Sequence, residues 1–156
     1  MFARQFLIAT LSVTSLALSS SAGAEASRRI INPSNLPDTT RFGYSHAAVV
    51  APGARTIFVA GQVGVSDQGP NDFKSQVDRS FANLLAVLEA AGSDARHVVK
   101  ITVLIKDHNA DKLKYLIETR RRVFGDQPPA STLIPVSALA LESFEFEIDA
   151  VAVVPQ

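Results

Sequence analysis

The chain lacks cysteine and tryptophan altogether, and its only methionine is the first of its 156 residues. Without cysteine there is no disulfide, no thiolate nucleophile and no thiolate-ligated metal. The three histidines, His46, His97 and His108, fall on different predicted elements and show no paired spacing, which argues against a zinc site. Glycine-rich phosphate-binding loops are missing as well. We therefore expect neither a metal nor a cofactor.

An excess of charge of either sign is also missing. The chain carries 15 Lys and Arg residues against 15 Asp and Glu residues. A near-neutral surface gives no electrostatic reason to bind nucleic acid or an anionic membrane. We therefore expect neither nucleic acid nor a membrane as a partner of the mature protein.

The first 24 residues have the pattern of a cleaved signal peptide. One positive charge, Arg4, precedes an uncharged and mostly apolar run over residues 6–18, and Ala22-Gly23-Ala24 supplies a small-x-small cleavage signal before Glu25. The alternatives are cleavage after Ala26 and an uncleaved membrane anchor, for which the run is short. We expect an exported protein, periplasmic or secreted if its host is bacterial.

After residue 24 the sequence predicts an extended lead-in over residues 25–41, followed by one domain over residues 42–156. Pro33, Pro37 and the lack of periodicity mark the lead-in. Within the domain, apolar spacing and turn residues predict alternating strands and helices. The predicted elements are strands over residues 44–50 and 55–60, joined as a hairpin by residues 51–54, a helix from Asp72 to Gly92, a strand over residues 97–106, a helix over residues 110–124, and strands over residues 132–136 and 144–153.

This order of elements predicts an α+β fold in which both helices pack on one face of a β-sheet. Runs such as Ile57–Ala60 and Val151–Val154 are apolar on both faces of their strands. Because two helices cover only one face, the other face needs a partner surface. We therefore expect a homo-oligomer whose sheets pack together.

Three short motifs are arranged as in a known protein family. They are Gly43-Tyr44-Ser45, Ala60-Gly61-Gln62-Val63 and Pro129-Ala130-Ser131-Thr132, followed by the closing run Phe146–Val153. With these motifs the chain resembles the RidA/YjgF family of reactive-intermediate deaminases, from about Phe42 to Val154. The resemblance implies the chorismate-mutase-like RidA fold, with a mixed sheet and two helices on one face. It also implies a homotrimer with a central barrel of sheets and a small-molecule cleft at each subunit boundary.

The resemblance assigns ligand-binding roles to four positions. Tyr44 matches the tyrosine that lines the family's pocket, and Gly61 matches the glycine of the turn that orients the substrate. Ser131 and Thr132 follow the third motif's proline and alanine, and their hydroxyls can hydrogen-bond a ligand. Each of the four has a plainer alternative role, as a sheet aromatic, a tight-turn glycine or a strand hydroxyl that satisfies backbone groups.

Two acidic residues are the candidate catalytic groups. Glu145, Glu147 and Asp149 share one face of the predicted last strand, since side chains alternate along a strand. By the resemblance, Asp149 falls where the family has the carboxylate that positions the attacking water, and Glu147 is the second candidate for that role. An exposed polar face is the alternative interpretation.

The chain departs from the family pattern at Ser131. In deaminating members this position is an arginine, which grips the substrate carboxylate through two charge-assisted hydrogen bonds, whereas a serine donates one neutral bond. Ala60 and Ile117 also replace polar residues of the pattern. We therefore expect deamination of short 2-imino acids to be weak or absent. Arg41, or one of Arg120–Arg122, could supply a replacement cation, although arginines at a helix end commonly lie on a solvated surface.

Three functions follow from the sequence. The first is binding of a small metabolite in clefts between subunits. The second is hydrolysis of a different enamine, imine or amide through a water activated by Asp149 or Glu147. The third is a protein-interaction or holdase role.

Overall fold

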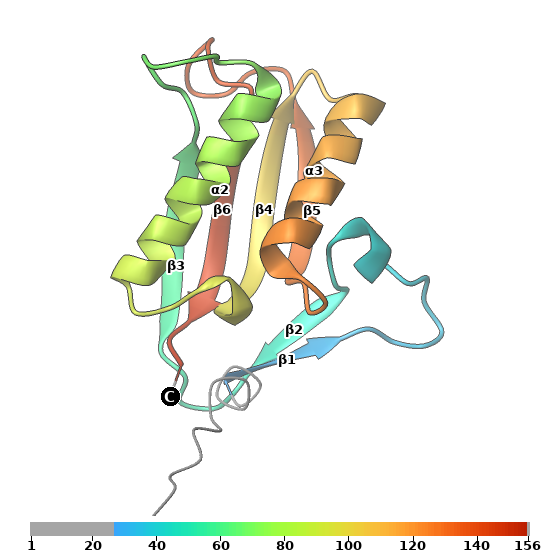
Figure 1. The fold of residues 1–156 in the computed structure, drawn as a ribbon. Helices are drawn as coiled ribbons and strands as arrows, with labels where there is room; N and C mark the ends of the chain where they lie inside the picture. Colours follow the sequence, from blue (N-terminus) through green and yellow to red (C-terminus); the bar gives the residue numbers. More distant parts are fainter. Residues whose placement is uncertain (1–26, 156) are drawn as a thin grey trace, which may run out of the picture.

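The computed structural model describes residues 27–155, so the predicted signal peptide, residues 1–24, lies outside the described residues. Residues 27–155 form a four-stranded sheet, two helices and a separate two-stranded ribbon (Figure 1). No helix in this range is long and apolar enough to cross a membrane. With η for a 3-10 helix, the elements are β1 (Arg28–Ile31), η1 (Thr40–Phe42), β2 (Ala47–Val50), β3 (Thr56–Val63), α2 (Phe73–Ala90), η2 (Ala95–His97), β4 (Val98–Lys106), α3 (Ala110–Phe124), β5 (Ala130–Val136) and β6 (Phe146–Val153).

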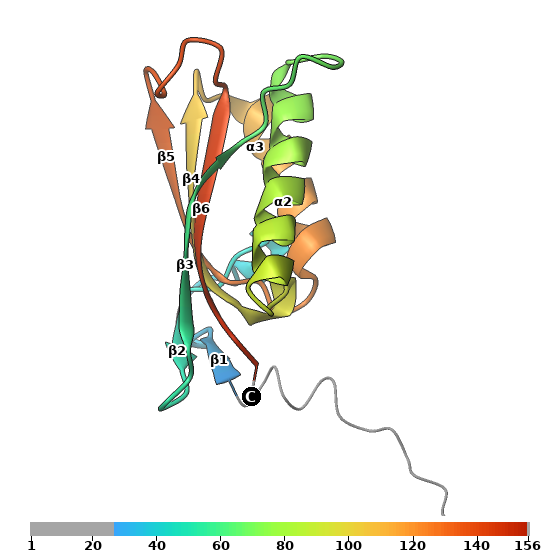
Figure 2. The ribbon, with the colours of Figure 1, turned by 90° about the vertical axis from the view of Figure 1, so that its left-hand side faces the viewer.

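The main sheet has the strand order β3-β6-β4-β5. Strands β4 and β5 run parallel, and the other neighbouring pairs run antiparallel. Helices α2 and α3 lie on the same side of this sheet, and no described helix covers its other side, which we call the open face (Figure 2). The predicted α+β fold with both helices on one face is confirmed.

The core lies between the two helices and the sheet. Asp72 caps α2 by accepting a hydrogen bond from the Ser75 N–H at 3.1 Å, as the sequence predicts. The chain leaves this helix through Gly92, whose φ of 75° is in the left-handed region that suits glycine. The buried apolar side chains of α2 are Val77, Phe81, Leu84 and Leu88, and those that meet them from β4 and β6 include Ile101, Val103, Ile105, Phe146 and Ile148.

The predicted hairpin between the first two strands of the domain is wrong. Residues 51–54 do form a turn, closed by a 3.2 Å hydrogen bond from the Ala54 N–H to the Ala51 carbonyl. However, β2 pairs with β1, and β3 pairs with β6. The turn therefore connects the ribbon to the main sheet rather than two neighbouring strands.

The ribbon exists because part of the predicted lead-in is a paired strand. Arg28 lies opposite Val50, and β1 and β2 stay in antiparallel register as far as Ile31 and Ala47. The buried Arg28 side chain donates hydrogen bonds to the backbone carbonyls of Arg96 and Gln127. These bonds attach β1 to the end of the main domain.

The open face of the sheet carries apolar side chains that are left uncovered. Phe58 is 80% exposed and Ile134 is 42% exposed. Strand register places Phe58 beside Val151 and places Ile134 beside Leu104. Large exposed apolar groups gathered on one sheet face are typical of a surface that another protein surface covers.

Candidate functional site

A pocket of about 380 Å³ opens between α3, the first half of β5 and the segment from the end of η1 to Tyr44. Most of its wall is apolar, and three polar side chains face it from one end. The apolar lining residues are Phe42, Leu113, Ile117 and Leu133, and the polar ones are Tyr44, Arg120 and Ser131. The sequence predicts that Tyr44 and Ser131 bind a ligand, and the structure brings them into the same pocket.

Arg120 is the charged group of this pocket. Its side chain is only 3% exposed. Its Nη1 donates a 3.1 Å hydrogen bond to the Ser131 Oγ, and its Cζ lies 5.7 Å from the centroid of the Tyr44 ring. The expectation of a solvated surface is therefore wrong for Arg120, whereas Arg121 and Arg122 are exposed.

Helix geometry explains why one of three consecutive arginines points inward. Successive residues of an α-helix are about 100° apart, so three neighbours cannot share a face, whereas residues three or four apart do. Arg120 follows Leu116 by four residues and Ile117 by three. It therefore lies on the stripe of α3 that faces β5, beside the buried Leu116 and the pocket-lining Ile117.

The guanidinium of Arg120 has no acidic partner among the residues that the structure describes. Among residues 27–155 no carboxylate lies within salt-bridge distance of it, and its Nε is buried without a hydrogen-bond partner. Burial lowers the pKa of Arg120 to about 10, a shift that the neighbouring Tyr44 opposes, so the side chain stays protonated at neutral pH. A buried cation with an unused donor is costly unless an anion pairs with it.

A second buried arginine shows what a structural role looks like in this protein. Arg28 is 6% exposed, and its guanidinium donates to two backbone carbonyls, although its Nη1, like the Nε of Arg120, is buried without a hydrogen-bond partner. Asp94 also raises the pKa of Arg28, against the larger lowering by burial. Arg120 has no comparable set of partners, because its one hydrogen bond to a described residue goes to a neutral hydroxyl.

Gly43 allows the tyrosine to reach the arginine. Its φ is 72°, and a Cβ at this position would lie 2.8 Å from the Cβ of Arg120 and 3.3 Å from the backbone nitrogen of Arg121. Only glycine fits both the conformation and the close approach. Beyond Tyr44, the Ser45 N–H donates a 2.9 Å hydrogen bond to the Pro129 carbonyl, which attaches this segment to the start of β5.

The remaining predicted site residues lie on the open face, away from the pocket. Gly61 sits where the pairing of β3 with β6 is irregular, between Val59 and Gln62. The Glu147 carboxylate lies directly over it, since a Cβ on Gly61 would overlap that carboxylate. Gly61 and Glu147 are therefore adjacent, and any side chain at position 61 would require the Glu147 carboxylate to move.

Asp149 and Thr132 share the open face, but each side chain already accepts a hydrogen bond within the chain. The Asp149 Oδ1 accepts a 3.2 Å hydrogen bond from the Thr102 N–H, and the Thr132 Oγ1 accepts a 2.9 Å bond from the Lys100 Nζ. Because side chains alternate along β5, Ser131 and Thr132 point to opposite faces. The six predicted site residues thus form two groups, Tyr44 with Ser131 in the pocket, and Gly61, Thr132, Glu147 and Asp149 on the open face.

Glu145 does not join the other two acidic residues of the last strand. It precedes β6, and its carboxylate lies 2.9 Å from the Lys112 Nζ and 3.6 Å from the Lys106 Nζ. These ion pairs connect the start of β6 to α3 and β4. We assign Glu145 a structural role.

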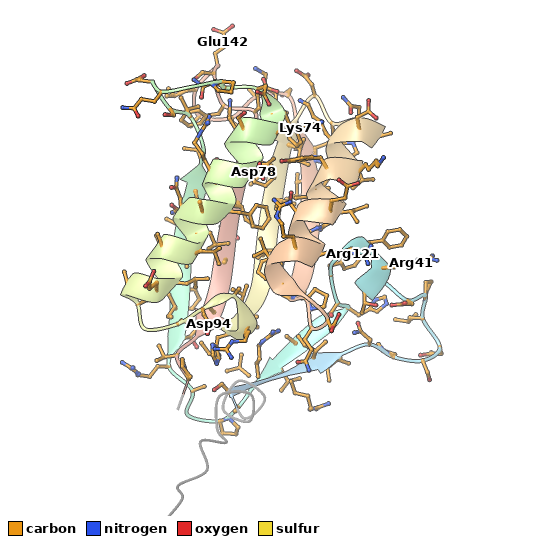
Figure 3. The ribbon with its side chains drawn as sticks, in the orientation of Figure 1. Arg41, Lys74, Asp78, Asp94, Arg121 and Glu142 are labelled. Carbon is orange, nitrogen blue, oxygen red and sulfur yellow. The ribbon has the colours of Figure 1, made fainter. Side chains whose placement is uncertain are left out.

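Arg41, the other candidate for the replacement cation, lies outside the pocket, and so does His46. Arg41 is exposed, lies over the Phe42 ring at 4.7 Å and sits at the outer rim of the molecule (Figure 3). The His46 Nε2 is 2.9 Å from the Pro37 carbonyl, and the His46 N–H donates to the Asn32 Oδ1 at 3.0 Å. Within residues 27–155 no group of three acidic or histidine side chains could hold a metal ion.

Fold and pocket define an α+β protein with a largely apolar pocket at the edge of a mixed sheet. The family model described as Endoribonuclease L-PSP matches residues 37–154, and the chain belongs to this family, the RidA/YjgF family. The chain is 34% identical over 130 residues to the 2-iminobutanoate/2-iminopropanoate deaminase of Rattus norvegicus, covering 81% of this chain and 90% of that protein.

Two further comparisons agree with this assignment. Protein DfrA of Myxococcus xanthus is 37% identical over 114 residues, which are 70% of this chain and 84% of that protein. The crystal structure of YyfB from Yersinia pestis, a Rid family protein of unknown function, superposes with a TM-score of 0.77 at 33% identity. That superposition covers 81% of this chain and 98% of YyfB.

Proposed function

We propose that the pocket binds a small organic carboxylate and that Arg120 is the residue that grips it. The observation that carries the proposal is a buried guanidinium that is hydrogen-bonded to Ser131 and has no acidic partner in the described part of the chain. By the resemblance, Ser131 occupies the position at which deaminating members of the RidA/YjgF family have their arginine. In this chain the cation comes to the same place from α3 instead of from β5.

The position of Arg120 removes the reason for expecting weak deamination. That expectation depends on the absence of a cation beside Ser131. The Arg120 Nη1 lies 3.1 Å from the Ser131 Oγ, and a guanidinium offers a planar pair of donors to a carboxylate. The charge that position 131 lacks is therefore available, and we propose that binding of 2-imino acids is retained.

We further propose that the protein is a homotrimer that packs through its open faces, as the family resemblance implies. The uncovered Phe58 and Ile134 support this, because their burial would stabilise an assembly. Assembly also explains why the predicted site residues are divided between the two faces of the sheet. Tyr44 and Arg120 lie on the helix side of the sheet, while Gly61 and Glu147 lie on the open face, so a complete site would need both groups, from two copies.

The reaction that this combined site supports best is hydrolytic deamination of a 2-imino or enamino acid. The carboxylate of Glu147 would take a proton from water as the water oxygen adds to the imine carbon. The nitrogen of the resulting carbinolamine receives both protons of the water, one through Glu147 and one from the new hydroxyl group. The carbon–nitrogen bond breaks, ammonia leaves, and a 2-oxo acid is formed. Glu147 is favoured over Asp149 for this role, because Asp149 already accepts a backbone N–H from β4.

Glu147→Gln is expected to lower kcat for a 2-imino acid by about 100-fold or more, the usual effect of losing a general base. Stopped-flow measurement of imine decay would give kcat, and calorimetric titration with the matching 2-oxo acid would give Kd, which should change little. Glu142→Gln, at an exposed loop position (Figure 3), is the matched control. Turnover that survives Glu147→Gln but is lost in Asp149→Asn would assign the role to Asp149 instead.

A wild-type protein that binds 2-oxo acids but turns over no imine would leave binding as the function and remove the hydrolytic step. If no carboxylate binds at all, the holdase role becomes the better candidate. Suppression of the aggregation of a denatured client protein would then be the assay to apply.

We also propose that residues 1–24 direct export and are removed. Expression of the full chain in a bacterial host should yield a periplasmic protein of 132 residues that begins at Glu25. Intact mass and N-terminal sequencing of the periplasmic fraction would check this. Full-length protein that stays with the membrane would contradict it.

A further inference from the structure

We infer that the ligand of this pocket is a monocarboxylate with a bulky apolar side chain, such as a branched aliphatic or an aromatic 2-imino acid. The inference rests on the proposed carboxylate binding at Arg120 and names the substrate class more narrowly. If this inference holds, three-carbon acids bind less tightly than longer acids. Dicarboxylates are disfavoured as ligands.

Within one chain the pocket has one charged side chain, and the Glu147 that the proposed assembly would add is an anion, so it offers a second ligand carboxylate no partner. Arg120 stands at one end with the hydroxyls of Tyr44 and Ser131, and every other lining side chain is apolar. A ligand with a carboxylate at each end would have to place the second one against Leu and Ile side chains without a hydrogen bond. That burial costs far more than the apolar contacts around it return, so the far end of the ligand must be apolar.

The apolar wall also extends well beyond the reach of a short acid. Leu113 lies seven residues before Arg120 on α3, which corresponds to about 10 Å along the helix axis. Leu133 lies two residues after Ser131 on β5, which corresponds to about 7 Å along the strand. Since α3 connects two parallel strands, it runs back along them, and both leucines lie in the same direction from the guanidinium. Ile117 lies between the two ends of this wall on α3.

The size of the pocket agrees with this interpretation. Its volume of about 380 Å³ lies within the range of about 300–1,000 Å³ typical of small-molecule sites. A three-carbon acid held at Arg120 would leave Leu113 and Leu133 in contact with water. A side chain of four carbons or an aromatic ring would cover both.

Calorimetric titration of the mature protein with a series of 2-oxo acids tests the inference, because these acids are stable analogues of the imines. The series is 2-oxopropanoate, 2-oxobutanoate, 4-methyl-2-oxopentanoate, phenylpyruvate and the dicarboxylate 2-oxoglutarate. Affinity should rise up to about fourfold for each methylene buried. We therefore expect 4-methyl-2-oxopentanoate to bind at least tenfold tighter than 2-oxopropanoate, and 2-oxoglutarate no tighter than 2-oxopropanoate.

Two variants test whether the preference for long acids depends on the apolar wall of the pocket. Ile117→Asn places an amide among the apolar side chains and should reduce the ratio of affinities between the long and the short acid to within about threefold. Arg121→Gln, at the exposed neighbour of Arg120, should leave the whole series unchanged.

The titrations distinguish failure of carboxylate binding from failure of the preference for an apolar side chain. If all the acids bind equally well, and Arg120→Gln weakens them all, carboxylate binding stands and the apolar-substrate inference is wrong. The inference is also wrong if 2-oxoglutarate is the tightest ligand. If none of the acids binds, or Arg120→Gln changes none of their affinities, the proposed function itself fails and the inference fails with it.

Discussion

Arg120→Gln is expected to weaken the binding of a 2-oxo acid by roughly 10- to 150-fold, the equivalent of about 1.5–3 kcal/mol for a hydrogen bond to a charged group. Glutamine keeps a polar side chain in the pocket but removes the positive charge that pairs with the ligand. Calorimetric titration of wild type, Arg120→Gln and Arg121→Gln measures the effect, and the last variant should bind like wild type. Equal losses in both variants would show a general effect of charge rather than a specific contact.

The same residue should have the opposite effect on the stability of the empty protein. Burial lowers the pKa of Arg120 from its ordinary value to about 10, so folding disfavours its charged form. This cost is fully present below about pH 10 and declines only as the pH rises through the folded-state pKa of Arg120 towards its higher unfolded-state value. At neutral pH, Arg120→Met should therefore raise the unfolding free energy, with an upper limit of about 3 kcal/mol.

Lost contacts reduce that gain. Methionine gives up the hydrogen bond to Ser131, worth about 1 kcal/mol, and the contact of the guanidinium with the Tyr44 ring. We still expect the ligand-free variant to be at least as stable as wild type in urea denaturation. Marked destabilisation of Arg120→Met would mean that the arginine is structural and would count against the proposed binding role.

Phe58→Glu is expected to convert the protein from trimer to monomer. Phe58 is 80% exposed in the single chain, and the proposed assembly would bury it against another sheet. A glutamate there would place an unpaired charge in the interface, at a cost of several kcal/mol in each subunit. Sedimentation velocity at micromolar concentration would distinguish the two states. Turnover should be lost with assembly, because Glu147 and Arg120 would no longer meet.

The matched control for that experiment is Val87→Glu. Val87 is also an exposed apolar residue, at 37%, but it lies on α2, on the opposite side of the sheet from Phe58. It should leave the trimer intact. A wild-type protein that sediments as a monomer, or a Phe58→Glu variant that remains a trimer, would contradict the proposed assembly.

Much of the fold could be predicted because its helices and central strands have strong local signals. The apolar spacing of α2, its Asp72 cap and the Gly92 that follows it agree with one another, and the structure matches all three. The run from Val98 to Lys106 is equally clear. Strand pairing has no comparable local signal, since alternation does not say which strand is the neighbour. For that reason the sequence predicts a lead-in where β1 lies, and it wrongly pairs β2 with β3.

The site could be predicted only in part for a related reason. Motif similarity identifies Tyr44, Gly61 and Ser131, but it compares positions along the chain and not side chains in space. Arg120 is one of three consecutive arginines, and the phase of α3 alone distinguishes it from the other two. That phase is readable from the spacing to Leu116 and Ile117, which puts Arg120 on the inner face of the helix.

The most direct test of the proposed carboxylate site is a crystal structure of the mature protein with 4-methyl-2-oxopentanoate bound. We expect the ligand carboxylate to lie about 2.7–2.9 Å from two guanidinium nitrogens of Arg120, with the branched chain of the ligand against Leu113 and Leu133. A ligand carboxylate held elsewhere, or an Arg120 side chain turned out to solvent beside an occupied pocket, would contradict the proposal.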